Sequence, residues 1–220
     1  MALLLYEHPF ASYCWKALIA LHERELPFEP RLVLSEEDRA ELARIWPPAT
    51  IPVLRDGAAA QTVPESTAVV EYLDRIGAAP PLVPAEPDPA LQARLWDRVL
   101  DAQVMTPMQK VVLDSLRSEA DRDAHGVEDA LAALDRSYEL LDSRLAGGGW
   151  LAGAEFTLAE CAAAPSLFYA RVVRRWDERR LVNLTRYFEA LMERPSVARV
   201  VAEARPYREV FPLPWPDYAG

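Results

Sequence analysis

A chain of 220 residues, about half of them hydrophobic, can bury a substantial core in one large domain or two small ones. The formal net charge is −10, and a sequence-independent nucleic-acid binder needs an excess of cations, so that class of function is not expected. No apolar run approaches the roughly 18 residues that a transmembrane helix needs, so no membrane span is expected either.

Neither cysteine lies in a pattern that predicts a metal site. Cys14 and Cys161 are far apart in the sequence, and neither has the spacing to other ligands that zinc requires. We therefore expect free thiols in a cytoplasmic protein, and no metal. Residues 1–6 are apolar but are followed at once by Glu7 and His8, which predicts a first strand rather than a signal peptide.

Short apolar strands and amphipathic helices alternate at the start of the chain. Strands are predicted at residues 3–6 and 28–34, with a helix between them that begins near Ser12 and ends by Pro27. A second helix follows Ser35, whose hydroxyl suits an N-cap, and it stops at a tryptophan followed by two prolines.

The next elements complete a mixed sheet. A strand around Val53 turns at Asp56 and Gly57, returns at residues 62–63, and leads into a helix from about residue 65 to 76. The predicted order is therefore β-α-β-α-β-β-α. Strands joined through a helix should be parallel and strands joined by a short turn antiparallel, which predicts a four-stranded mixed sheet with helices on its faces.

A proline-rich stretch divides the chain. Residues 77–89 contain five prolines and little that could sustain a helix, so a linker is predicted at 79–89. It separates an α/β domain of residues 1–78 from a second domain of residues 90–220. No strand pattern occurs in the second domain, which is predicted to be all helical.

Apolar positions at helical spacing define the second domain. A long helix is predicted from Leu91 to about Leu116, bent at Pro107. Thr157 and Glu160 are spaced as a capping box, which stabilises a helix start and has no chemical role. Further helices are predicted around 131–145, at 157–174 and 184–193, and after Pro195, followed by an irregular aromatic tail at 206–220.

Four motifs, in this order, resemble those of the bacterial-type cytosolic glutathione S-transferases. They are His-Pro-Phe-Ala-Ser-Tyr-Cys-Trp-Lys at 8–16, Ile-Pro-Val-Leu at 51–54, Glu-Ser-Thr at 65–67 with Tyr-Leu at 72–73, and Gly-x-x-Phe-Thr-Leu-Ala-Glu at 153–160. The resemblance extends over nearly the whole chain. It implies a thioredoxin-like first domain, glutathione as co-substrate, a homodimer and a role in detoxification.

The resemblance assigns glutathione ligands to the second and third motifs, the latter including Thr67, and to Thr50 just before the second. It implies a cis bond before Pro52, so that Ile51 offers its N–H and C=O to the cysteinyl backbone of glutathione, as an added strand would. It places the γ-glutamyl carboxylate at Ser66 and the γ-glutamyl ammonium beside Glu65, at a helix start where free amides favour an anion.

The group that activates the glutathione thiol is less clear, because Ala11 stands where many relatives have a reactive residue. Ser12 is the first candidate and Tyr13 the second, with backbone amides of the helix start as a further source of stabilisation. Cys14 could form a mixed disulfide, as in omega- and beta-like relatives. Its register places it in the first helical turn, where we expect a buried, inert thiol.

Two further parts of the site are implied by the resemblance. Many relatives have a lysine near position 50, so in this chain Lys16 or Arg39 is left to meet the glycine carboxylate of glutathione. The electrophile pocket should lie between the domains, although Met105, Met108 and Val112, on the first helix of the second domain, could equally be core residues. Its predicted lining is Phe10, Met105, Met108, Val112 and Tyr169, capped by Phe211 and Trp215.

The resemblance implies an enzyme that joins the glutathione thiolate to a small hydrophobic electrophile. Two alternatives remain open at this point. One is a glutathione-dependent isomerase or thiol oxidoreductase of the same fold, and the other is a non-catalytic protein that binds glutathione, which Ala11 makes credible.

Overall fold

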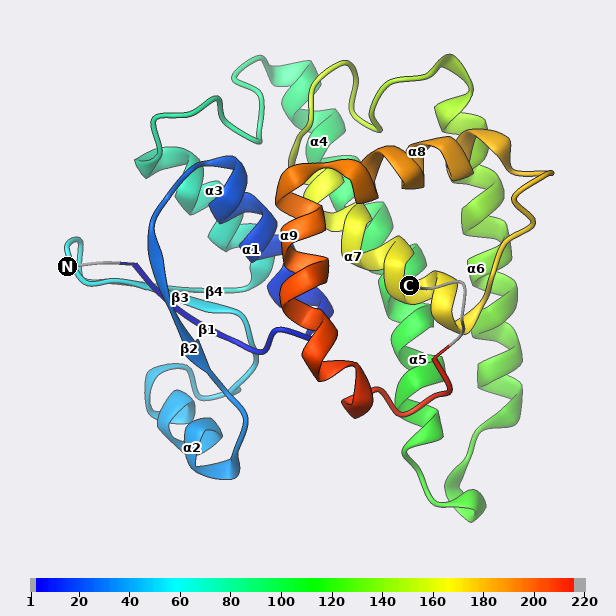
Figure 1. Ribbon diagram of the computed structural model, residues 1–220, viewed down its shortest axis with the longest axis horizontal. Helices are drawn as coiled ribbons and strands as arrows, with labels where there is room; N and C mark the ends of the chain where they lie inside the picture. Colours follow the sequence, from blue (N-terminus) through cyan, green and yellow to red (C-terminus); the bar gives the residue numbers. More distant parts are fainter. Residues whose placement is uncertain (1–2, 216–220) are drawn as a thin grey trace.

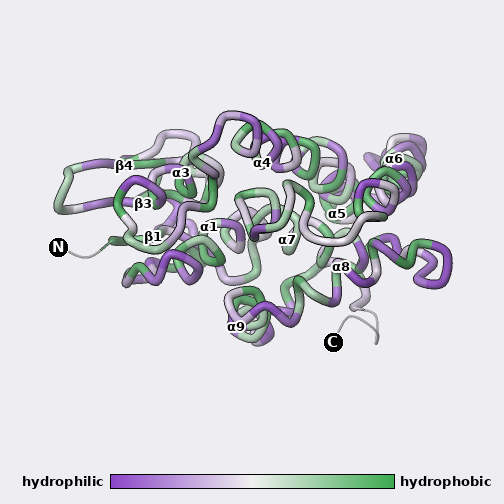
Figure 2. The backbone as a smooth tube through the Cα atoms, turned by 90° about the horizontal axis from the view of Figure 1, so that it is seen from above, coloured by the Kyte–Doolittle hydropathy of each residue, from purple (hydrophilic) through white to green (hydrophobic). Residues whose placement is uncertain are grey.

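The computed structural model describes residues 3–215, in which an α/β part and a helical part lie side by side (Figures 1 and 2). The strands are β1 (Leu3–Glu7), β2 (Phe28–Leu32), β3 (Val53–Asp56) and β4 (Gln61–Pro64). The helices are α1 (Ser12–Glu23), α2 (Glu36–Ile45), α3 (Ser66–Ile76), α4 (Pro87–Leu100), α5 (Thr106–Ser115), α6 (Ala124–Arg144), α7 (Leu158–Val173), α8 (Val182–Glu193) and α9 (Pro195–Ala204). Pro216 and the rest of the predicted tail lie outside the described residues.

Within residues 3–215 the four strands form one mixed sheet in the order β2-β1-β3-β4. β1 and β2 are parallel because α1 returns the chain to the same edge, whereas β3 and β4 are antiparallel across a short turn. β1 and β3 are antiparallel neighbours at the centre. The predicted fold class, element order and strand directions of this part are confirmed.

Alternation along the strands gives the sheet two different faces. Leu5 and Leu54, paired between β1 and β3, are fully buried in the main core with α1 and α3. The next pair, Tyr6 and Val53, faces the other side and packs against Leu42 of α2 in a smaller core. The main core continues into the helical part, so α1 and α3 connect the sheet to the second domain.

The predicted linker ends earlier than expected, because α4 begins at Pro87. A proline is tolerated in the first turn of a helix, where its missing N–H would have no partner in any case. The prediction that residues 77–89 sustain no helix is therefore wrong for the last three of them. The preceding stretch is fixed to α3, since Asp74 accepts the amides of Leu82 and Val83 at 2.9 and 2.8 Å.

The long helix predicted beyond the linker consists of α4, a π-helical turn at Asp101–Met105, and α5. Pro107 lies in the first turn of α5 and cannot donate a hydrogen bond to the carbonyl of Gln103, four residues earlier. The hydroxyl of Ser137 in α6 donates to that carbonyl instead, at 2.7 Å. The proline is thus accommodated by a neighbouring helix.

The helix α7 is buried along almost its whole length and runs through the centre of the helical part (Figure 2). Its predicted capping box is confirmed: the Thr157 amide donates to Glu160 Oε2 at 2.9 Å, and the Thr157 hydroxyl accepts the amide of Ala159 at 3.2 Å. Glu160 is fully buried and also accepts the Leu151 amide at 2.8 Å. These contacts anchor the α6–α7 connection, in keeping with a structural role.

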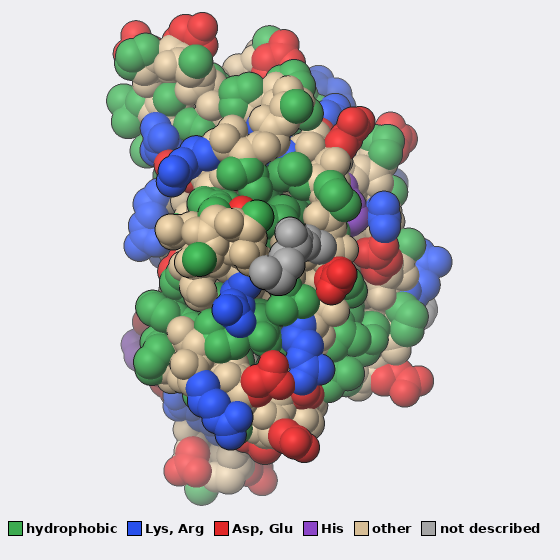
Figure 3. Space-filling model, turned by 90° about the vertical axis from the view of Figure 1, so that its left-hand side faces the viewer, with side chains coloured by type: hydrophobic (Ala, Val, Ile, Leu, Met, Phe, Trp, Pro, Cys, Tyr) green, Lys and Arg blue, Asp and Glu red, His purple; other side chains and the backbone are tan. Residues whose placement is uncertain are grey.

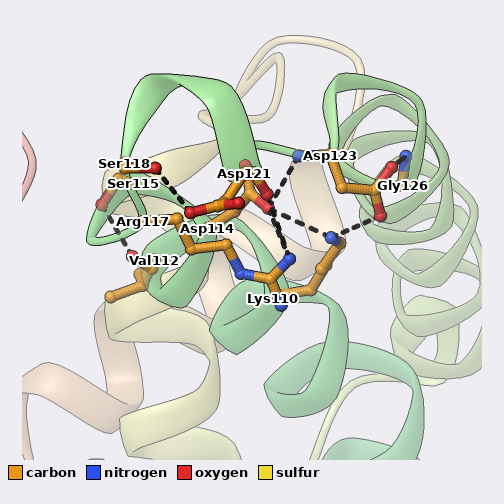
Figure 4. Close-up of polar contacts among 9 residues, drawn as sticks. All are labelled: Lys110, Val112, Asp114, Ser115, Arg117, Ser118, Asp121, Asp123 and Gly126. Carbon is orange, nitrogen blue, oxygen red and sulfur yellow. Dashed lines mark hydrogen bonds and ion pairs between the residues drawn. The ribbon is translucent and has the colours of Figure 1, made fainter.

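The turn between α5 and α6 is held by the buried carboxylate of Asp114 and by ion pairs of Lys110 (Figure 4). Asp114 is nearly buried and accepts from Lys110 Nζ at 3.2 Å and from the Asp123 amide at 3.1 Å. Asp123 caps α6 through the Gly126 amide at 2.9 Å and also pairs with Lys110 at 2.7 Å. One lysine therefore joins the end of α5 to the beginning of α6.

Charges of both signs occur together on the face formed by the α/β part and near the end of α7. On the end of the molecule formed by the α/β part, acidic and basic side chains are interspersed (Figure 3). The arginines near the end of α7 are paired as well, for example Arg174 with Asp135 at 2.7 Å and Arg180 with Glu139 at 2.9 Å. These pairs are typical of a solvated helix end.

Glu7, the last residue of β1, provides a test of the packing between β1 and α9. Glu7 is 3% exposed, and burial, followed by the charge of Glu203, raises its pKa from 4.5 to about 7. The native state therefore holds a proton that the unfolded chain has released, and stability falls as pH rises from about 4.5 to about 7. Glu7→Gln should raise the free energy of unfolding at pH values near 8 by up to about 3 kcal/mol, and change it little near pH 5.

Denaturant titrations of both proteins at the two pH values measure this difference. Glu203→Gln, at an exposed position, should show a smaller effect of the same sign, because it removes only the second cause of the shift. An equal effect of Glu7→Gln at both pH values would contradict a buried, protonated Glu7.

Candidate functional site

A cavity of about 880 Å³ lies between the α/β part and the helical part. The start of α1, the loop before β3 and the start of α3 form one wall, and α4, α5 and the segment after α9 form the other. Its lining comprises His8, residues 10–13, Val33, Arg39, residues 48–52, residues 65–67, Arg98, Asp101, Met108, Gln109, Val112, Leu113, Tyr169 and residues 210–212.

The loop before β3 presents a free backbone edge to the cavity. The Ile51–Pro52 peptide bond is cis, as predicted. Among the described residues no hydrogen bond is found to the N–H or C=O of Ile51. Thr50 accepts from Trp46 Nε1 at 2.9 Å, which holds the loop against α2. Ile51 therefore has one donor and one acceptor available to an extended ligand.

The start of α3 is the second polar feature of the cavity. Glu65, the residue before the helix, has φ +69° and ψ +124°, a conformation that non-glycine residues rarely adopt and that often occurs at functional sites. Ser66 follows it, 5% exposed, as the first helical residue. The first amides of a helix have no intrahelical acceptor, so this end favours an anion.

A buried ionic cluster, the Lys16 cluster, lies beneath this wall and consists of Lys16, Thr67, Asp97 and Asp101. Lys16 is 1% exposed and donates to Thr67 Oγ1 at 2.7 Å and to Asp101 Oδ2 at 3.3 Å, and it forms an ion pair with Asp97. Thr67 in turn donates to Asp97 at 3.0 Å. Lys16 is thus fully engaged inside the protein, and the expectation that it could meet a glycine carboxylate is wrong.

The part of the cavity beside Ile51 and the start of α3, its polar half, is lined by charged groups of both signs. Asp101 lines the wall, and its Oδ1 is buried without a hydrogen-bond partner among the described residues. Burial raises the Asp101 pKa, and Lys16 opposes that shift. Arg98, one turn earlier, is exposed in the same wall, and Arg39 of α2 lies opposite with a side chain that is 60% exposed. Arg39 therefore remains as a cation for the glycine end of a ligand.

The start of α1 separates the two halves of the cavity. Ala11 is the N-cap and provides no side-chain hydrogen bond, and the first turn contains no acidic residue. Ser12 and Tyr13 are the first two helical residues, so their amides and the Ser12 hydroxyl are available to a ligand. Burial and the charge of Asp101 raise the Tyr13 pKa to about 12, so its hydroxyl keeps its proton at neutral pH.

Cys14 does not reach the cavity. Its side chain is fully buried, and burial raises the pKa of its thiol above the ordinary value. A thiolate nucleophile needs exposure or a stabilising cation, and Cys14 has neither exposure nor a lowered pKa. The expectation of a buried thiol agrees with this position.

The other half of the cavity is apolar. Phe10 and Tyr169 meet edge to face with ring centroids 5.3 Å apart, and the Tyr169 hydroxyl donates to the Phe10 carbonyl at 2.9 Å. Phe211 stacks on Tyr169 with centroids 6.1 Å apart. Met108 and Val112 of α5 complete the wall, as expected.

Two expected residues lie elsewhere. Met105, in the π-helical turn, is 1% exposed and belongs to the main core instead of the cavity lining. Trp215 packs behind the aromatic wall against Phe168, with centroids 5.7 Å apart, and does not line the cavity.

Sequence reasoning missed several lining residues. Gln109 and Leu113 are neighbours of the predicted positions on α5, so helical spacing alone could have found them. His8 was visible only as part of the first motif. Its Nδ1 accepts the Phe10 amide at 3.0 Å, its ring meets Tyr207 edge to face, and burial lowers its pKa.

Two family models match the chain. One, described as the N-terminal domain of glutathione S-transferase, matches residues 5–81. The other, described as the C-terminal domain of glutathione S-transferase, matches residues 123–190. Together they account for more than half of the chain.

Individual relatives agree with the models. Glutathione S-transferase GstB of Escherichia coli K12 is 29% identical over 191 residues, which covers 84% of this chain and 91% of that protein. A probable maleylacetoacetate isomerase of Vibrio cholerae is 26% identical over 218 residues, covering 93% and 92%.

A solved structure is similar over almost the same length. The crystal structure of a glutathione S-transferase from Methylobacterium radiotolerans, in complex with glutathione sulfonate, has a TM-score of 0.80 and 28% identity. The match covers 91% of this chain and 95% of that chain. With both domain models in sequence order and this agreement in fold, the chain belongs to the glutathione S-transferase family.

Proposed function

We propose that the protein is a glutathione transferase that joins the glutathione thiolate to a small hydrophobic electrophile. The main support is the division of one cavity into two halves. Ile51 and the start of α3 offer backbone groups to a peptide, and Phe10, Met108 and Tyr169 offer an apolar wall. The start of α1, with its free amides, lies between them.

The polar half suits the three parts of glutathione. Ile51 would pair with the cysteinyl backbone, as in the addition of a strand to a sheet edge. The γ-glutamyl carboxylate would lie at Ser66, and its ammonium beside the carboxylate of Glu65. The complex of the Methylobacterium relative with glutathione sulfonate supports a peptide ligand of this kind.

The start of α1 would then stabilise the sulfur. A thiol pKa of about 8.5 must fall by one or two units for the thiolate to dominate near neutral pH, which requires about 1.4–2.8 kcal/mol. The Ser12 hydroxyl and the amides of Ser12 and Tyr13 are donors of the kind that supply such stabilisation. Tyr13 keeps its proton and can act as a further donor.

The reaction needs no protein nucleophile. The thiolate of glutathione forms the new bond to carbon, and the protein orients it and excludes water from the apolar half. A thiol oxidoreductase that works through Cys14 is disfavoured by the complete burial of that residue. A glutathione-dependent isomerase remains the second candidate, because the Vibrio cholerae relative is named a probable maleylacetoacetate isomerase and the match covers 93% of this chain.

Substitution of Ser12 tests the activation of the thiol. Ser12→Ala should raise the pKa of bound glutathione by about one unit and lower kcat/KM for chlorodinitrobenzene by roughly tenfold near pH 6.5, because one donor is lost. The ultraviolet absorbance of the thiolate against pH and initial conjugation rates measure both quantities.

Ser143→Ala, on the exposed face of α6, is a matched control that should change neither quantity. An unchanged rate of conjugation in Ser12→Ala would show that the Ser12 hydroxyl does not stabilise the thiolate. Binding of glutathione by the unmodified protein without turnover of any electrophile would favour a non-catalytic role.

Substitution of Arg39 tests the assignment of the glycine end. Arg39→Gln should weaken glutathione binding about three- to tenfold, because an exposed ion pair with a carboxylate contributes about 1 kcal/mol. The glycine monoethyl ester of glutathione should bind both proteins equally. Calorimetric titration of each ligand into each protein measures the four affinities. An equal loss of affinity for both ligands in Arg39→Gln would contradict the assignment.

We also propose that the protein acts as a homodimer in the cytoplasm. Three apolar side chains on α3 and α4, which a second subunit could cover, are exposed: Ile76 (41%), Leu91 (62%) and Leu95 (46%). Sedimentation should give twice the chain mass of 24.7 kDa, and Leu91→Glu combined with Leu95→Glu should shift it to the monomer. A monomeric unmodified protein would exclude the dimer.

A further inference from the structure

We infer that His8 is a catalytic hydrogen-bond donor to the carbonyl oxygen of an α,β-unsaturated carbonyl substrate. The inference rests on the proposed function and names the class of electrophile. His8 lines the cavity on the same turn as Phe10 of the apolar wall and Ser12 at the start of α1.

The two ring nitrogens of His8 have different surroundings. Nδ1 accepts the Phe10 amide at 3.0 Å, so this nitrogen is turned toward its own backbone turn. The hydrogen bond found for the His8 ring within residues 3–215 is the one at Nδ1, which leaves Nε2, on the opposite side of the ring, available to a ligand. The edge-to-face contact with Tyr207, at a centroid distance of 5.4 Å, limits rotation of the ring.

The contact at Nδ1 determines which nitrogen holds the proton. An amide N–H can be accepted only by the lone pair of an unprotonated nitrogen, so a neutral ring has its hydrogen on Nε2. Burial lowers the His8 pKa, which favours this neutral form. His8 therefore offers a fixed, neutral N–H donor at a cavity wall.

His8 lies near the place where the glutathione sulfur is expected to attack the electrophile. The turn of residues 8–13 contributes to the same cavity lining as the start of α3 and the aromatic residue Tyr169. An electrophile on Phe10 and Tyr169 that is attacked by a sulfur at Ser12 lies beside this turn. Ala11 provides no side-chain donor there, so His8 is the imidazole available to the reacting group.

Addition to a conjugated carbonyl creates the charge that such a donor stabilises. The thiolate forms a bond to the β-carbon, the C=C electron pair moves toward the carbonyl, and the oxygen becomes an enolate. The Nε2–H donates to that oxygen, and a proton from solvent then adds to the α-carbon, which completes the conjugate. In a cis–trans isomerisation the same enolate would rotate about the former double bond and expel the thiolate.

Displacement of chloride from an activated aryl chloride develops its negative charge on the ring and its nitro groups and involves no carbonyl oxygen, so it should depend less on this donor. Removal of one oxyanion donor lowers kcat by about 10²–10³ in enzymes where it has been measured. We therefore expect a roughly 100-fold loss of kcat that is specific to the carbonyl substrate.

Three variants separate the donor from the local fold. His8→Gln keeps an N–H donor near the position of Nε2 and loses the acceptor at Nδ1. His8→Asn keeps an acceptor for the Phe10 amide but is too short to replace Nε2. His8→Phe keeps neither, and His125→Gln, at an exposed position on α6, is the matched control.

Each variant is assayed for conjugation of glutathione to benzylideneacetone and to chlorodinitrobenzene, together with calorimetric binding of glutathione. With benzylideneacetone, kcat should fall roughly 100-fold in His8→Asn and His8→Phe but less than about tenfold in His8→Gln. Rates with chlorodinitrobenzene and glutathione affinity should remain within about threefold in His8→Asn, which keeps the acceptor for the Phe10 amide, and in His125→Gln.

A loss of kcat with benzylideneacetone in His8→Gln, with kcat retained in His8→Asn, would show that His8 acts only by accepting the Phe10 amide. That result would overturn the inference. Equal losses of kcat with benzylideneacetone and with chlorodinitrobenzene would also overturn it. Turnover of chlorodinitrobenzene without turnover of benzylideneacetone by the unmodified protein would also overturn it, while the proposed transferase function would stand. Turnover of neither substrate would overturn both.

Discussion

The site depends on one buried positive charge. Lys16 of α1 is 1% exposed and joins Thr67 of α3 to Asp97 and Asp101 at the end of α4. Burial of a charged group is unfavourable unless it is paired, and loss of one partner from a buried pair typically costs about 3–5 kcal/mol. The cluster therefore fixes three helices relative to one another, and with them the start of α3, Asp101 and the start of α1. Both walls of the cavity are held by the same contacts.

This arrangement separates recognition from chemistry. The groups that we propose for recognition are largely backbone groups: the free edge of Ile51 and the first amides of α3. Backbone groups are positioned by the fold and do not depend on a particular side chain. The groups next to the expected sulfur and electrophile, Ser12 and His8, are side chains on one short turn. Substitutions there can change the reaction while the peptide site is preserved.

Much of the fold follows from local patterns. Alternating apolar positions, the Asp-Gly turn and the capping box at Thr157 act over a few residues, so the sequence was sufficient to predict them. Pairing over long distances could not be predicted in this way. Lys16 appeared available to a ligand because its partners lie 51 to 85 residues away. Met105 appeared to face the cavity, but the π-helical turn that contains it changes the helical phase and leaves the side chain in the core.

The most direct test of this account is a crystal structure of the protein with glutathione bound. We expect the cysteinyl N–H and C=O to pair with Ile51, the γ-glutamyl carboxylate to lie on the amides at Ser66, and the sulfur to lie within hydrogen-bond distance of the Ser12 hydroxyl or amide. A glutathione molecule bound elsewhere, or a sulfur directed away from the start of α1, would contradict the account.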